Sequence, residues 1–124
     1  MKKALPFLPA VLFYGIIFFL SSRPLDLGVS FPGFDKLAHG AAYGILGFLL
    51  ALGFFRTLRA PLKTIIGGVF SAGVLLGILD EVHQIFVPGR NADARDAAAD
   101  AAGVILGLAM YRLIFRKRQP EKHL

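Results

Sequence analysis

The sequence predicts an all-α fold: an integral membrane four-helix bundle formed by one domain over residues 1–124. The chain is 56% hydrophobic and has a mean hydropathy of +0.64. Its apolar residues form four long runs, whereas a soluble protein of this size shows periodic polar faces. Each run is long enough to cross the hydrocarbon core of a bilayer, which takes about 20 helical residues.

The predicted helices span about residues 5–22, 34–55, 62–86 and 96–115. The first follows Lys2 and Lys3, and no Ala-x-Ala cleavage site follows it, so we expect a retained helix and not a removed signal peptide. Pro6 and Pro9 lie in its first turns, where a missing backbone donor costs least. Proline and glycine mark the loop before the second helix and the loop after the third.

Basic residues are distributed unequally between the two ends of this bundle. Ten lie at the end that carries both termini: Lys2, Lys3, Arg56, Arg59, Lys63, Arg112, Arg116, Lys117, Arg118 and Lys122. Four lie at the other end, among seven acids: Arg23, Lys36, Arg90 and Arg95. The positive-inside rule therefore predicts a multi-pass protein of the bacterial cytoplasmic (inner) membrane, with both termini in the cytoplasm and residues 116–124 as a basic cytoplasmic tail.

Composition also limits the classes of partner and chemistry. The net charge is +6, but the basic residues flank apolar runs and form no stripe along a polar helix, so we expect membrane lipids as partners and no nucleic acid. The chain has no cysteine, which excludes disulfides, thiolate metal sites and cysteine nucleophiles.

Glycine recurs at four-residue spacing in three of the predicted helices. The pairs are Gly40 with Gly44, Gly73 with Gly77, and Gly103 with Gly107. Such GxxxG spacing lets helix backbones approach closely in lipid, where no hydrophobic force drives helices together. The pattern predicts close helix packing within one chain or between chains, which leaves the oligomeric state open.

Polar side chains gather at the acidic end of the bundle. Asp35, His39 and Tyr43 follow one another at four-residue steps on one face of the second helix. On the third helix, Asp80 lies three and four residues before His83 and Gln84, and on the fourth, Asp96 lies four before Asp100. Because exposing these groups to lipid is costly, we expect them to face the interior of the bundle.

Four stretches, "DKLAHGAAYGILG", "DEVHQ", "PGR" and "DAAADAAGVILG", occur in the order found in the VanZ-like family of small bacterial membrane proteins, which the chain resembles from about Asp35 to Gly107. The family is named from a glycopeptide-resistance cluster, so the resemblance implies a fold and an envelope role but no defined reaction. The matching positions are Asp35, Lys36, His39, Tyr43, Glu81, Gln84, Arg90, Asp96, Gly103 and Gly107. Asp100 departs from the pattern, because an asparagine is expected there.

Three hypotheses for the polar cluster follow. In the first, it binds a cell-envelope ligand, either a lipid-linked cell-wall precursor or a glycopeptide, with Arg90 or Lys36 on an anionic group. Its candidate ligand-binding residues are Asp35, Lys36, His39, Tyr43, Glu81, Gln84, Arg90, Asp96 and Asp100.

In the second hypothesis, a divalent cation activates water for hydrolysis. The candidate metal ligands are His39, His83, Glu81 and Asp96. The sequence has no HExxH spacing and no nucleophile motif, so it leaves open whether the protein is an enzyme. In the third, the cluster is structural and locks helix ends together through ion pairs and hydrogen bonds.

The predicted orientation can be tested with reporter fusions. Alkaline phosphatase needs disulfides that form only outside the cytoplasm. We expect it to be inactive when fused after Leu124 and active when inserted in the predicted loop at residues 23–33. Activity of the fusion after Leu124 would contradict the assignment.

Overall fold

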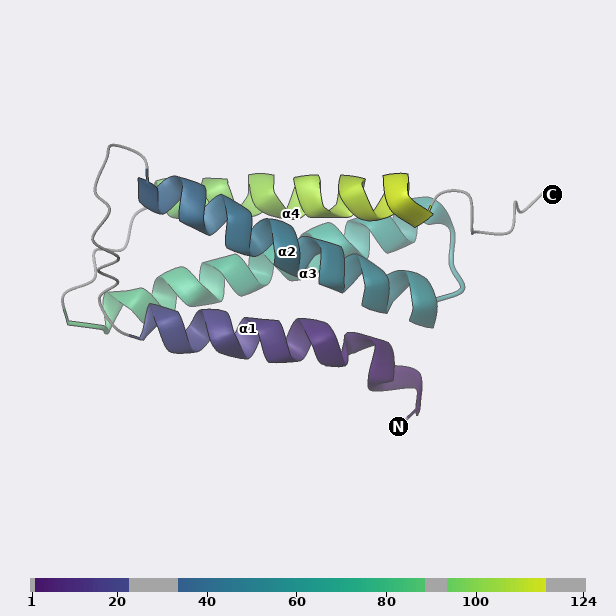
Figure 1. Ribbon diagram of the computed structural model, residues 1–124, viewed down its shortest axis with the longest axis horizontal. Coiled ribbons are helices and arrows are strands. Elements are labelled where there is room, and N and C mark those ends of the chain that lie inside the picture. Colours follow the sequence, from purple (N-terminus) through teal and green to yellow (C-terminus); the bar gives the residue numbers. More distant parts are fainter. Residues whose placement is uncertain (1, 23–33, 89–93, 116–124) are drawn as a thin grey trace.

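The computed structural model describes residues 2–22, 34–88 and 94–115, and these form a bundle of helices that confirms the predicted all-α fold (Figure 1). A short 3-10 segment, η1 (Lys2–Phe7), leads into α1 (Leu8–Ser21). Three longer helices follow: α2 (Phe34–Thr57), α3 (Leu62–Ile85) and α4 (Ala94–Phe115). In the described part of the chain, four helices are long and apolar enough to cross a membrane.

The helices run in alternating directions (Figure 1). The start of η1, the end of α2, the start of α3 and the end of α4 therefore lie at one end of the bundle. The opposite end, where α1 ends, α2 begins, α3 ends and α4 begins, is called the polar end below.

The outer surface of the bundle is apolar. Large side chains on every helix are exposed, among them Leu12, Leu37, Ile85 and Leu106, which are 61%, 65%, 63% and 66% exposed. An apolar surface of this extent is incompatible with a water-soluble monomer and is what a lipid-facing surface requires. The chain is therefore a multi-pass membrane protein.

The closest helix contact joins α2 and α4 at their glycines. A Cβ atom added to Gly103 would lie 2.9 Å from the backbone nitrogen of Gly44, and one added to Gly107 would lie 2.6 Å from the backbone nitrogen of Phe48. Carbon does not approach nitrogen this closely, so only glycine at these two positions allows the observed separation of the helices. Backbone contact of this kind replaces side-chain interdigitation in membrane bundles.

The third helix packs on the same part of α4. Gly73 accommodates the side chain of Val104, and Gly77 accommodates that of Asp100. Tyr43, Leu46 and Val69 are also buried there, and together these side chains form the core between α2, α3 and α4. The first helix adds Ala10 and Ile17 to the same buried cluster. Its Tyr14 hydroxyl donates a 2.9 Å hydrogen bond to the carbonyl of Leu76 on α3.

The glycine contact predicts that substitution by alanine lowers the stability of the protein at Gly103 but not at Gly67. Gly103→Ala forces α4 away from α2, so we expect it to lower the free energy of unfolding by about 1–3 kcal/mol, the usual range for overpacking. Gly67→Ala is the matched control, because no atom lies within 4 Å of its added Cβ, and alanine is the better helix former there. Thermal unfolding in detergent should show a lower melting temperature for the first variant only. Equal melting temperatures for both would contradict the contact.

Candidate functional site

The polar end buries several polar side chains. Among the described residues, six are buried there: Ser21, Asp80, Glu81, Gln84, Asp96 and Asp100. Those on α3 and α4 lie on the helix faces that carry the packing glycines, because positions three and four apart share a helix face. The contacts that bring α3 and α4 together therefore also bring these polar groups together.

Two acids of α4 pair with two bases of α2. The Lys36 ammonium lies 2.9 Å from Asp96 Oδ1, which makes a buried ion pair with one partly exposed partner. One turn deeper, His39 Nδ1 lies 2.8 Å from Asp100 Oδ1, a hydrogen-bond distance. The other ring nitrogen of His39, Nε2, lies 3.8 Å from Asp96 Oδ2, which is too long for a hydrogen bond.

A second set of contacts runs from α3 to its neighbours. Asp80 Oδ2 accepts hydrogen bonds from the Tyr43 hydroxyl at 3.3 Å and from the Gln84 amide at 3.5 Å. The same amide donates to Ser21 at the end of α1, also at 3.5 Å. These lengths are at the long limit, so the contacts orient the groups and add little binding energy.

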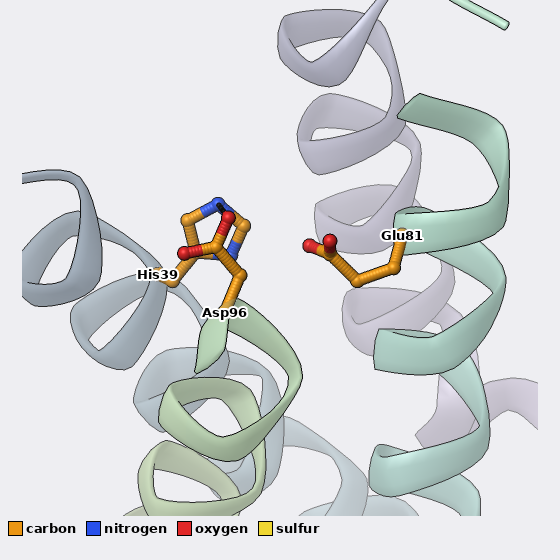
Figure 2. Close-up of side chains that lie close together, drawn as sticks. All are labelled: His39, Glu81 and Asp96. Carbon is orange, nitrogen blue, oxygen red and sulfur yellow. Dashed lines mark ion pairs between the residues drawn. The ribbon is translucent and has the colours of Figure 1, made fainter. Parts of the chain in front are cut away.

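Glu81 faces the histidine from across the bundle. Figure 2 shows His39 and Asp96 side by side, with the Glu81 carboxyl group pointing toward them from α3. One ligating atom from each of the three lies within 4.8 Å of the other two. A second set lies deeper in the bundle and consists of His39, Asp80 and Asp100, whose ligating atoms also lie within 4.8 Å of one another. Either set could hold a metal ion, since each offers one imidazole nitrogen and two carboxylates.

The other candidate histidine has different neighbours. The ring of His83 stacks on Phe18, with 4.0 Å between the ring centroids, and its Nε2 lies 2.9 Å from the hydroxyl oxygen of Ser22. Within the described ranges it belongs to neither set that could hold a metal. Its contacts join α3 to the end of α1.

A partly open pocket of about 130 Å³ lies between α1, α2 and α3 at this end. Its lining residues are Ile17, Leu20, Ser21, Ala38, His39, Ala42, Tyr43 and Asp80. Most of the wall is apolar, and the polar groups are few and lie together, which is the usual composition of a small-molecule site. The volume is below the roughly 300 Å³ at which such sites begin, so the pocket has room for one part of a larger ligand.

The structure places the predicted site residues as follows. Lys36, His39 and Tyr43 of α2 lie close to acids of α3 and α4. Arg90 lies outside the described residues, and so does the side chain of Asp35.

Two polar residues of the pocket were not among the predicted ligand-binding positions, Ser21 and Asp80. Asp80 continues the spacing of Gly73 and Gly77 along one face of α3, a signal that could have identified it. Ser21 carries no comparable signal, since a serine at a helix end is common.

Comparison with known proteins identifies one relationship. A family model described as VanZ/LLP1 matches residues 5–116, which confirms the resemblance seen in the motifs and extends it over nearly the whole chain. Comparison with curated proteins gives no match, and neither does comparison with solved structures.

The ion pair between α2 and α4 should contribute to stability. Lys36→Met leaves the buried carboxylate of Asp96 without the ammonium group 2.9 Å away, so we expect a melting temperature several degrees lower in detergent. Asp96→Asn in the same chain removes the buried charge and should restore most of the loss.

Lys63→Met is the control, because Lys63 is exposed at the opposite end of the bundle. If Lys36→Met melts like this control, the pair has no structural role.

Proposed function

Because the chain belongs to the VanZ/LLP1 family, and because its polar groups border an apolar pocket, we propose that it binds an amphiphilic molecule of the cell envelope. Lipid-linked cell-wall precursors are the class that fits best: a polar head on a lipid tail. The pocket is the observation that carries the proposal. A purely structural lock between helix ends has no need of a cavity.

The two parts of such a ligand match two parts of the site. Ile17, Leu20 and Ala42 give the pocket an apolar wall at the level of the membrane-spanning helices, which suits a lipid chain. His39 and Ser21 offer hydrogen-bonding groups beside that wall, which suit a sugar or phosphate head.

The polar end adds charge of both signs. The Lys36 side chain is 30% exposed while it pairs with Asp96, so an anionic head group can approach it at the edge of the site. Glu81 lies on the opposite side, on α3, and its carboxyl group can accept hydrogen bonds from hydroxyl or amide groups. With the positive-inside orientation, this end faces the outer leaflet, where precursors are displayed for wall synthesis.

Filling the pocket tests the proposal. Ala38 lines it, so Ala38→Leu should occupy space that the ligand needs. We expect cells that carry this variant to lose the effect of the wild-type protein on glycopeptide susceptibility, with unchanged protein level and melting temperature. Ala41→Leu is the matched control on the same helix, since Ala41 is exposed on the outside of the bundle.

Glu81→Gln tests the polar side of the site in the same assay, and we expect the same loss because the amide carries no charge and offers one acceptor oxygen in place of two. If Ala38→Leu keeps full activity, the pocket is not the binding site. If Glu81→Gln loses activity only in proportion to a lower melting temperature, the cluster is a structural lock. If photocrosslinking shows that the glycopeptide itself contacts the protein, the glycopeptide replaces the lipid-linked precursor as the proposed ligand.

A further inference from the structure

Among the described residues, four carboxyl groups each bury one oxygen atom that accepts no hydrogen bond: Asp80 Oδ1, Glu81 Oε1, Asp96 Oδ1 and Asp100 Oδ2. Asp96 Oδ1 has the Lys36 ammonium at 2.9 Å. The most deeply buried of the four residues are Asp80 and Asp100. The two residues are 1% and 0% exposed. A buried carboxylate oxygen that loses its water and gains no partner is costly, so each such atom in a native protein needs an explanation.

The two acids lie together because α3 has a glycine between them. A Cβ atom at Gly77 would lie 3.1 Å from Asp100 Oδ2, so this oxygen rests against the α3 backbone one turn before Asp80. His39 approaches from α2 with Nδ1 2.8 Å from Asp100 Oδ1. Ligating atoms of the three residues all lie within 4.8 Å of one another.

Charge distinguishes this set from the one formed by His39, Glu81 and Asp96. Asp96 already has the ammonium of Lys36 at 2.9 Å. In the described chain, no lysine or arginine pairs with Asp80 or Asp100. Two carboxylates beside a neutral imidazole carry two negative charges, which one divalent cation would neutralise in a medium where unpaired charge is expensive.

We propose that His39, Asp80 and Asp100 bind one divalent metal ion. One imidazole nitrogen and two carboxylates suit Zn²⁺ or Mn²⁺ better than Mg²⁺ or Ca²⁺, which prefer oxygen ligands alone. Metal–ligand distances of about 2.0–2.2 Å require small adjustments. Ligating atoms that are now up to 4.8 Å apart must approach each other, whereas His39 Nδ1 and Asp100 Oδ1, now 2.8 Å apart, must separate slightly. His39 and Asp80 also line the pocket, which gives the ion an entry path and leaves room for water in its open coordination positions.

The neighbouring groups fit a metal-bound histidine. When Nδ1 binds the ion, the ring proton is on Nε2, which faces Asp96 Oδ2 at 3.8 Å. A hydrogen-bonded carboxylate behind the second nitrogen is the usual support of a metal-binding histidine, and Asp96 reaches hydrogen-bond distance if the two atoms approach by about 0.8 Å. This site goes beyond the proposed function, since the ion binds the protein alone and needs no envelope ligand.

Metal binding to the purified full-length protein in detergent tests the site. After chelation and dialysis against Zn²⁺ or Mn²⁺, we expect one ion per chain by elemental analysis and a higher melting temperature than that of the chelated protein. Asp80→Asn, Asp100→Asn and His39→Gln should each weaken binding at least about 10-fold. His83→Gln is the matched control and should bind like the wild type, because His83 contacts Phe18 and Ser22 instead.

Folding of the variants is checked separately. Asn is isosteric with Asp and removes a buried charge, so the chelated Asp100→Asn protein should melt no lower than the chelated wild type. The proposal is overturned if the wild type retains no more metal than His39→Gln. It is also overturned if Glu81→Gln abolishes binding while Asp80→Asn preserves it, because the ion then sits on the other set. Neither result depends on the susceptibility assay, so the metal site and the proposed function can fail independently.

Discussion

The backbone contact between α2 and α4 is the constraint on which the rest of the structure depends. Gly103 and Gly107 allow α4 to lie directly on the backbone of α2 around Gly44. This contact fixes the rotation of both helices about their axes. His39 and Asp100 lie just beyond it toward the polar end, and the 2.8 Å distance between them follows from the fixed rotation. A bulkier residue in the contact would separate these two groups as well as the helices.

Because their surroundings are apolar, the polar groups at this end form ion pairs and hydrogen bonds with one another. Lys36 neutralises Asp96 at the edge, and His39 contacts Asp100 deeper in the bundle. The same arrangement leaves one oxygen of Asp80, which lines the pocket, and one of Asp100 without a donor, which a network built only for stability would avoid. α1 contributes mainly the apolar wall of that pocket, so the charged residues of three helices and the apolar residues of the fourth make one site.

The sequence was sufficient to predict the fold and the helix faces that turn inward, but it did not predict which polar side chains contact each other. Hydropathy predicted the four spans, and helical spacing predicted that the acids of α3 and α4 turn inward, because both signals are local. His39 and His83 looked alike in the sequence, since each lies near the end of an apolar helix. Only the rotation of α3 directs His83 to Phe18 and Ser22 while Asp80 faces the pocket. Contacts of this kind depend on the packing of several helices, which no single segment encodes.

Buried carboxylates from two helices and a histidine from a third form the proposed cation site inside the bundle. Anomalous diffraction from a crystal of the protein soaked in Mn²⁺ tests it most directly. We expect one anomalous peak, between the carboxyl groups of Asp80 and Asp100 and the ring of His39. An anomalous peak between Glu81 and Asp96, or no peak within the bundle after a saturating Mn²⁺ soak, would contradict the proposed site.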